Sequence, residues 1–362
     1  MDRVARWLRF ASRRLTGELR LSMPPHDYQD GRAMVLPPCA RATCIRLDLC
    51  RNTLRFGPAS GGAFTALSTL RIERGHMDCR ELEDVVSSRC PGLKELTLGY
   101  VSLQGDPGVC IRSDSLEYLE IFGELKVRDH GRLEVAAPKL RALTIRGSLP
   151  EDTRISAPML SEVCWTYDDY DPSCHQFVDV GRHLRRLEIE TNSAAELMNM
   201  FDTIEELNLT VDIAEGVNEY RRFLKDINNV AKCEVLSVTF TGEEHAFRPT
   251  MLHLLKKCTR IRKLEVFLGS SEDESPCPSL CPCRLQENFI VNSINLGSLE
   301  EVEIHFDETY ELLYLIELLS KKALILKKII ISYESSYDPL LIKEVREMVR
   351  SICHPDIKLE FT

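Results

Sequence analysis

The segment CWTYDDYDPSCH, residues 164–175, gathers the side-chain types that nucleophilic catalysis uses. It holds carboxylates, two thiols and a histidine. A thiol nucleophile needs a base held against it in space, and closeness in sequence does not supply that geometry. The aspartates beside Pro172 instead fit a solvated loop after a strand that ends at Trp165. The chain also has no Gly-rich phosphate loop and no nucleophile elbow, so we predict that it is not an enzyme.

A second group of reactive side chains, Cys277, Cys281 and Cys283, raises the question of a zinc site. Structural zinc usually takes two pairs of ligands at matching ends, and no second pair is evident here. The surrounding stretch, SSEDESPCPSLCPCRLQEN at 270–288, is rich in Ser, Glu, Asp and Pro, which is typical of a flexible surface insertion. We therefore predict no metal and no cofactor.

The composition is that of an ordinary folded protein, with 44% hydrophobic and 28% charged residues. A net charge of -10 argues against a general nucleic-acid binder, which needs an excess of Lys and Arg. Residues 1–55 hold eleven Arg against five acids, a net of +6, so the remainder carries -16. No apolar run approaches the length of about 18 residues that a membrane span requires. Fourteen cysteines without an opening signal peptide favour reduced thiols in the cytoplasm and/or nucleus.

One leucine pattern, L-x-x-L-x-L, recurs along almost the whole chain, with Ile, Val or Cys replacing some leucines. Successive copies between residues 44 and 261 begin 20 to 29 residues apart, and the last two steps are 38 and 27 residues. This spacing is that of leucine-rich repeats, with one long insertion near the end. The copies begin at 44, 67, 93, 116, 140, 160, 184, 204, 233, 261, 299 and 326, and a weaker copy begins at 16.

These repeats predict an α/β leucine-rich-repeat solenoid, or horseshoe, with about 12 to 13 parallel strands on its concave side. The second and third apolar residues of each copy lie two apart on a short strand and so point into one core. A single copy cannot bury that face, so neighbouring copies must stack. Returns should cross the convex side, extended between 123 and 160. Apolar spacing predicts helical returns over 80–88, 217–230, 248–257, 310–322 and 338–352.

The third, fifth and seventh positions of each copy should face the concave groove. In the twelve copies from residue 44 onward they hold eleven acids and six bases, so we expect a partner with a basic surface. The competing interpretation is that these charges simply face water. Aromatic residues are stronger contact candidates, because they are enriched in binding hot spots. The candidate partner-binding residues are Tyr118, Glu120, Phe122, Arg146, Glu188, Glu190, Glu206, Phe267, Glu301 and Glu303.

The first fifteen residues, MDRVARWLRFASRRL, form an amphipathic helical pattern. An Arg-rich segment poor in acids could be an organellar transit peptide. We favour a helix that caps the first repeat and buries its apolar face. That face comprises Val4, Trp7, Leu8, Ala11 and Leu15.

The chain resembles the plant F-box/leucine-rich-repeat proteins, especially the large grass group with a C-terminal FBD-like region. WLRFASRRLTGELRLSMP at 7–24 is similar to the segment that follows the F-box there, and CPGLKELTL, AAPKLRAL and SAPMLSEV are similar to the internal repeats. LGSLEEVEIHFDETYELLYLIELLSKKALILKKIIIS at 296–332 is similar to the FBD-type ending. The resemblance implies an N-terminal cap and post-F-box-like segment at 1–43, repeats at 44–295 with the irregular insertion at 270–288, and FBD-like repeats at 296–362 that continue the solenoid.

The resemblance implies a protein-interaction role. Members of this family dock their F-box on a Skp-type adaptor of a cullin–RING ubiquitin ligase, while the repeats recruit the substrate. The F-box itself has no counterpart among these residues. We expect a non-enzymatic protein that binds an unknown protein substrate, and a Skp-type adaptor only if an F-box lies upstream. An F-box-less scaffold or decoy, or a truncated product without a ligase role, is the alternative, and no nucleic acid or membrane partner is expected.

Overall fold

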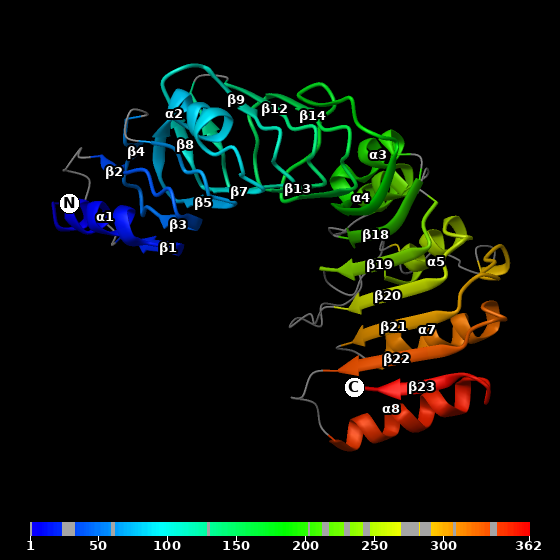
Figure 1. The fold of residues 1–362 in the computed structure, drawn as a ribbon. Helices are drawn as coiled ribbons and strands as arrows, with labels where there is room; N and C mark the ends of the chain where they lie inside the picture. Colours follow the sequence, from blue (N-terminus) through cyan, green and yellow to red (C-terminus); the bar gives the residue numbers. More distant parts are fainter. Residues whose placement is uncertain are drawn as a thin grey trace. The chain divides into compact units, whose positions relative to one another are not determined.

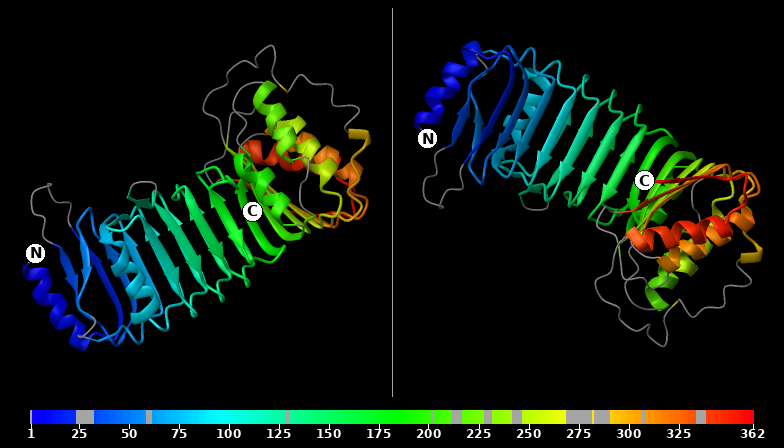
Figure 2. Two further views of the ribbon diagram at one scale, coloured as in Figure 1. Left: turned by 90° about the horizontal axis from the view of Figure 1, so that it is seen from above. Right: turned by 90° about the horizontal axis from the view of Figure 1, so that it is seen from below.

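The chain forms two compact units, unit 1 at residues 1–181 and unit 2 at residues 182–362. In each unit a parallel sheet makes one layer and the connecting segments make the other (Figures 1 and 2). The structure is a computed structural model. It describes residues 2–23, 33–58, 62–128, 131–201, 203–211, 217–227, 232–241, 247–268, 282, 291–306, 309–333 and 339–362.

The inner sheet of unit 1 is made of the predicted repeat strands, paired in chain order. Its strands are β1 (Gly17–Ser22), β3 (Ala42–Asp48), β5 (Thr69–Glu73), β7 (Glu95–Gly99), β10 (Tyr118–Phe122), β13 (Ala142–Arg146) and β15 (Glu162–Thr166). The register places Leu96, Leu119 and Leu143 side by side, and all three are buried. Because side chains alternate along a strand, the residues between these leucines point to the other face of the sheet.

The outer layer of unit 1 changes along the chain from short helix to extended strand. The return predicted over 80–88 is α2 (Cys79–Asp84) followed by a π-helical turn at Val85–Arg89. The extended returns predicted between 123 and 160 are β12 (Arg132–Ala136) and β14 (Asp152–Ser156), which form a second parallel sheet with β9 (Gly108–Arg112) and β16 (His175–Val178) from outside that range. Shorter strands complete the layer: β2 (Met34–Leu36) with β4 (Leu54–Phe56), and β6 (His76–Asp78) with β8 (Ser102–Gln104) and β11 (Lys126–Val127).

The predicted N-terminal helix is α1 (Asp2–Arg14), which packs at the start of unit 1 and contacts β2 (Figure 2). Leu8 is fully buried and Ala11 is 7% exposed, so the buried side of the helix is largely the one predicted. Trp7 is an exception, because 48% of it is exposed. Successive residues are rotated by about 100° around the helix axis, so Trp7 lies to one side of the direction that Leu8 and Ala11 share. Its side chain therefore points away from the core.

The sheet of unit 2 also follows the repeats in chain order. Its strands are β17 (His183–Glu190), β18 (Thr203–Val211), β19 (Val235–Phe240), β20 (Lys263–Leu268), β21 (Glu301–Phe306), β22 (Lys328–Tyr333) and β23 (Lys358–Phe361). Its helices are α3 (Thr191–Met200), α4 (Val217–Asp226), α5 (Phe247–Lys257), α7 (Thr309–Lys322) and α8 (Pro339–Ile352). Four of these helices match the predicted ones, with α4 ending before 230. α3 was not predicted, because its apolar stripe is weak.

The predicted insertion at 270–288 lies outside the described residues except for Pro282, and so do Cys277, Cys281 and Cys283. The cysteines in the described part of the chain are all free thiols. Burial raises the pKa of the Cys90 thiol to about 12. None of the described helices is long and apolar enough to cross a membrane.

Candidate protein-interaction surface

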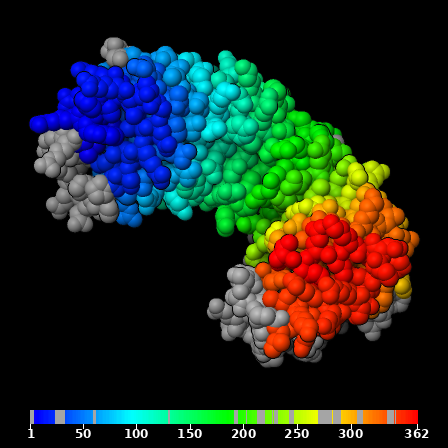
Figure 3. Space-filling model, turned by 60° about the horizontal axis from the view of Figure 1, so that its bottom comes forward, coloured from blue at the N-terminus to red at the C-terminus, as the bar shows by residue number. Residues whose placement is uncertain are grey.

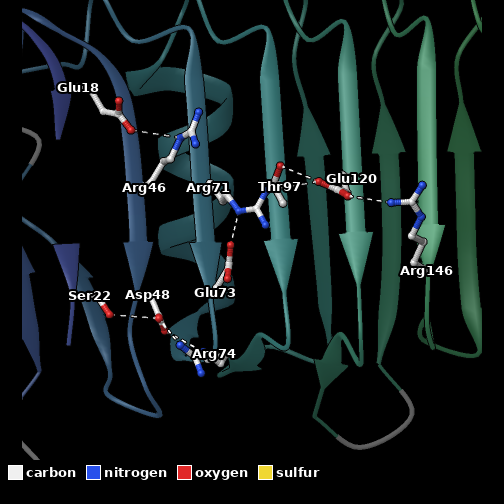
Figure 4. A network of polar contacts seen from close by, with 10 residues as sticks. All are labelled: Glu18, Ser22, Arg46, Asp48, Arg71, Glu73, Arg74, Thr97, Glu120 and Arg146. Atoms are coloured by element: carbon white, nitrogen blue, oxygen red, sulfur yellow. Dashed lines mark hydrogen bonds and ion pairs between the residues drawn. The ribbon is translucent and has the colours of Figure 1, made fainter. Parts of the chain in front are cut away.

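In-register pairing aligns the outward-facing side chains of the inner sheet in rows that cross the strands. One row in unit 1 contains Arg71, Thr97, Glu120 and Thr144, each from the next repeat. The side chains of Arg71, Thr97 and Glu120 reach toward one another across the sheet (Figure 4). A partner lying along the row would therefore meet one side chain from each repeat.

Glu120 is the centre of the polar contacts on β10. Its carboxylate accepts a hydrogen bond from Thr97 Oγ1 at 3.3 Å. On one side, Arg71 Nη1 lies 3.9 Å from Glu120 Oε2, and on the other, Arg146 Nη1 lies 3.9 Å from Glu120 Oε1 (Figure 4). Two guanidinium groups thus compensate this one carboxylate. Glu120 and Arg146, both predicted contact residues, act together and do not form an acidic patch.

A group of aromatic side chains lies beside Glu120. The ring of Phe122 covers Gly99, where an added Cβ would come within 2.1 Å of the ring. Tyr100 packs edge-on against Phe122, with ring centroids 5.7 Å apart, and the Arg71 guanidinium carbon lies 5.3 Å from the same ring. Tyr118 is 46% exposed and Tyr100 is 59% exposed. Aromatic and arginine side chains are the commonest hot-spot residues of protein interfaces, and here they are exposed together.

The residues that follow β5, β7, β10, β13 and β15 form a further row, which we call the exit row. All of them have positive φ, and each of the first four donates its backbone N–H to the last strand residue of the next repeat. Two of its tyrosines project strongly, with Tyr167 76% exposed. The exit row consists of Arg74 (φ 54°), Tyr100 (φ 50°), Gly123 (φ 66°), Gly147 (φ 139°) and Tyr167 (φ 65°).

Two of the three acidic residues predicted on the first strands of unit 2, Glu188 and Glu206, share one cation. Arg186 lies 3.5 Å from Glu188 on its own strand, β17, and 3.5 Å from Glu206 on β18. Glu190 lies at the end of β17, opposite Thr210. The sequence prediction placed these glutamates on one face, and the structure brings Glu188 and Glu206 to the same arginine.

A second acidic group of unit 2 surrounds Lys263. Its Nζ lies 2.6 Å from Glu265, 3.3 Å from Glu303 and 3.7 Å from Glu301. Glu265 and Glu303 are direct neighbours across β20 and β21, an arrangement that would repel without a cation between them. Burial alone would lower the pKa of Lys263, but its hydrogen bonds to these glutamates outweigh burial and raise the pKa.

Next to this group, Phe267 stacks on His305 with ring centroids 4.3 Å apart and planes at 4°. His305 Nε2 also lies 3.2 Å from Glu303 Oε1. Phe267 is therefore half covered by a neighbour that the sequence analysis did not select. Lys263, counted among the groove-facing bases, and His305 were not selected as contact residues, although the register pairs them with the selected Glu301 and Phe267. Tyr100 was missed because it lies one position beyond β7.

The ten predicted residues thus form three groups. The first, on β10 and β13, holds Tyr118, Glu120, Phe122 and Arg146; the second, on β17 and β18, holds Glu188, Glu190 and Glu206; the third, on β20 and β21, holds Phe267, Glu301 and Glu303. In unit 2 the strand between the second and third groups, β19, carries uncharged residues at its outward positions. The groups differ in chemistry, because the first is aromatic and charge-compensated and the third has excess negative charge.

The segment 164–175 is structural at its ends. Trp165 is fully buried and packs edge-on against Tyr170 at 5.1 Å and beside His175 at 5.1 Å. His175 accepts a hydrogen bond from the backbone N–H of Asp171, and burial lowers its pKa. Asp169 and Asp171 are exposed, as the predicted solvated loop requires, but Tyr170 turns inward. Within the described residues no three His, Cys, Asp or Glu side chains are grouped to hold a metal ion.

The stacked parallel strands, each built on L-x-x-L-x-L, define a leucine-rich-repeat protein. The family model of the leucine-rich repeats of the FBD-associated F-box protein At5g56370 matches residues 4–232, which is more than half of the chain. The chain belongs to this family, and its repeats support a protein-interaction role. The matched region includes most of α1. A comparison with curated proteins gave no significant match.

Proposed function

We propose that the chain recognises a protein substrate through its inner sheets, as the recruiting part of an F-box-type receptor of a cullin–RING ubiquitin ligase. The exposed Tyr100 and Tyr118 beside the half-buried Phe122 carry the proposal, because aromatic side chains are enriched in the hot spots of protein interfaces. Family membership supports the ligase context.

The charge of unit 2 supports a basic partner. Residues 182–362 contain 22 Lys and Arg against 31 Asp and Glu, a net of -9. On its inner sheet, Lys263 is shared by three carboxylates, and the neighbouring Lys328 is shared as well, because it pairs with Glu360 and interacts with Glu301 and Glu303, so carboxylates outnumber lysines there. A lysine or arginine from a partner would add the missing cations, and long-range attraction would speed its approach.

The experiment is crosslinking of the tagged chain in cells, followed by binding measurements with the captured partner. Tyr118→Ala and Glu301→Lys/Glu303→Lys should each weaken binding by about tenfold or more, since hot-spot residues carry most of the affinity. The matched control is Arg154→Ala on the outer sheet, which should change nothing. Equal affinity for all these variants would reject the inner sheets as the binding surface.

The ligase role needs its own readout, because a scaffold or decoy would bind the same partner. We expect the partner to carry ubiquitin when it is co-expressed with the full receptor chain and a Skp-type adaptor, and to lose it with Tyr118→Ala. A partner that binds but gains no ubiquitin under any of these conditions would favour the scaffold or decoy function.

A further inference from the structure

One flank of α1 exposes two large aromatic side chains. Trp7 is 48% exposed and Phe10 is 59% exposed, and their spacing of three residues places them on the same side of the helix. The neighbouring side of the helix already buries Leu8 and Ala11 in unit 1. The only other tryptophan of the chain, Trp165, is fully buried, which is the ordinary condition for so large an apolar group.

The same flank is strongly basic. Arg6, Arg13 and Arg14 are exposed, and the guanidinium carbon of Arg14 lies 4.9 Å from the centroid of the Phe10 ring. Within the part of the chain that the structure describes, Arg6, Arg9, Arg13 and Arg14 form no ion pair. By contrast, Arg46 and Arg71 on the inner sheet of the same unit both pair with glutamates. The α1 arginines are thus an uncompensated positive patch on a protein of net charge -10.

We propose that this flank, defined by Trp7, Phe10, Arg13 and Arg14, is a second docking surface that binds an acidic protein segment carrying apolar side chains. Carboxylates would pair with the free guanidinium groups, and an apolar side chain would cover the two rings. Tryptophan and arginine dominate hot spots at protein interfaces, and Arg–carboxylate pairs add directional hydrogen bonds. The flank faces outward at the N-terminal end of unit 1, and the deep-blue segment lies open on the surface (Figure 3).

A protein segment fits this flank better than an anionic membrane does. A helix that lies on a membrane inserts a broad apolar face into the lipid. The most apolar side of α1 is instead occupied, because Leu8 and Ala11 pack in the core of unit 1. The surface of α1 that remains available consists of two aromatic rings and a few arginines. A surface of this extent suits a small contact with a protein segment.

The test is a selection of random peptides displayed on phage against the full immobilised chain, with a parallel selection on Trp7→Ala/Phe10→Ala. Both side chains are exposed, so the variant should fold, which circular dichroism and thermal unfolding will check. We expect the peptides that depend on Trp7 and Phe10 to be net negative and to carry an aromatic or aliphatic residue. Synthetic copies should bind about tenfold or more weakly to Trp7→Ala/Phe10→Ala and to Arg13→Glu/Arg14→Glu. The charge-matched control, Arg112→Glu/Arg154→Glu on the outer sheet, should bind them as the unchanged chain does.

Three results would overturn the proposal. The first is that no enriched peptide depends on the flank, and the second is that the dependent peptides are neutral or basic. The third is a lipid surface as the ligand, which would appear as a blue shift of Trp7 fluorescence with phosphatidylserine-containing vesicles but not with phosphatidylcholine vesicles. Trp165 is buried and would contribute a constant background. Variants of the inner sheets should leave peptide binding unchanged, which separates this surface from the proposed substrate site.

Discussion

Gly147 is the residue whose identity the backbone fixes most tightly. Its φ of 139° favours glycine, and an added Cβ would lie 2.1 Å from the carbonyl oxygen of Gly123 in the preceding repeat. A backbone atom cannot swing aside as a long side chain can. Gly17 also has a positive φ, of 97°, but nothing lies within 4 Å of the place its Cβ would occupy.

Comparing these two glycines distinguishes the energetic cost of a positive φ from the cost of a steric clash with the added methyl group. We expect Gly17→Ala to lower the free energy of unfolding by about 1 kcal/mol and Gly147→Ala by about 3 kcal/mol. Urea denaturation followed by circular dichroism measures both. Similar losses for the two variants would show that the exit row can shift to admit a methyl group.

His175 makes the stability of the chain depend on pH. Burial lowers its pKa from 6.5, so the folded chain holds it neutral while the unfolded chain binds a proton more readily. The free energy of unfolding should therefore fall as pH drops below about 6.5, until the lowered pKa of the folded state is passed. His253 is half-buried, and burial together with the nearby Lys256 and Lys257 lowers its pKa, so it should add to the effect.

The variant His175→Gln should flatten this pH dependence between about pH 5 and 7, because glutamine keeps an acceptor for the Asp171 N–H and does not titrate in that range. Urea midpoints measured at several pH values provide the check. His354→Gln, at a position whose side chain is 70% exposed, is the control. If the free energy of unfolding of His175→Gln changes with pH as steeply as that of the unchanged chain, other groups cause the pH dependence.

At the scale of the elements, β20 and β21 are joined by a shared cation as well as by backbone hydrogen bonds. Lys263 on β20 lies against Glu265 of its own strand and Glu303 of the next. The two carboxylates are opposite each other in the register, and the lysine turns their repulsion into attraction. Nearby pairs on exposed surfaces contribute little, but these side chains are only 24 to 31% exposed.

Removing this cation should loosen the pairing of the two strands. We expect Lys263→Met to lower the free energy of unfolding by about 1 kcal/mol, and Lys263→Met/Glu303→Gln to recover most of the loss because the repulsion is then gone. Chemical denaturation measures both variants. Lys358→Met, at a lysine whose side chain is 71% exposed, is the control and should have almost no effect. If Lys263→Met/Glu303→Gln is as unstable as Lys263→Met, repulsion between Glu265 and Glu303 is not the cause of the loss.

The sequence predicted the inner strands closely, because each carries its own leucines and needs no partner to be recognised. The outer layer was harder. Residues 123–160 were predicted as extended, yet their pairing into a second sheet depends on neighbours in space. Trp7 was placed on the buried face because the helical pattern ranks it with Leu8, and only the packing of α1 shows that its ring points aside. In the candidate site, the repeat spacing predicted which outward-facing residues align in rows across the strands. The sharing of Lys263 among three glutamates depends on how far these side chains reach, which the spacing does not determine.

At the scale of the whole molecule, the two units differ in charge. Unit 1 contains 24 Lys and Arg against 25 Asp and Glu, a net of -1, while unit 2 has a net of -9. Nearly all the net charge therefore lies in one half of the chain. That half should dominate the long-range attraction of a basic partner.

The association rate of the captured partner should therefore fall steeply as NaCl is raised, because salt screens the charges over about a Debye length. Glu301→Lys/Glu303→Lys should reduce both the rate and its salt dependence, whereas Tyr118→Ala should mainly raise the dissociation rate. Surface plasmon resonance at several salt concentrations separates these effects. An association rate that does not respond to salt would exclude electrostatic attraction by unit 2.

The exit row has a consequence for how such a protein can change. Its backbone shape repeats from one copy to the next, yet the same position holds arginine, tyrosine or glycine. Arg74, Tyr100 and Tyr167 already adopt a positive φ without being glycine. One exposed side chain can therefore replace another at these positions without disturbing the leucines beneath. Positions 74, 100 and 167 thus form a set of exchangeable sites on a constant frame. New binding preferences could be acquired there by drift or by directed randomisation, while Gly147 stays fixed by collision with the backbone of Gly123.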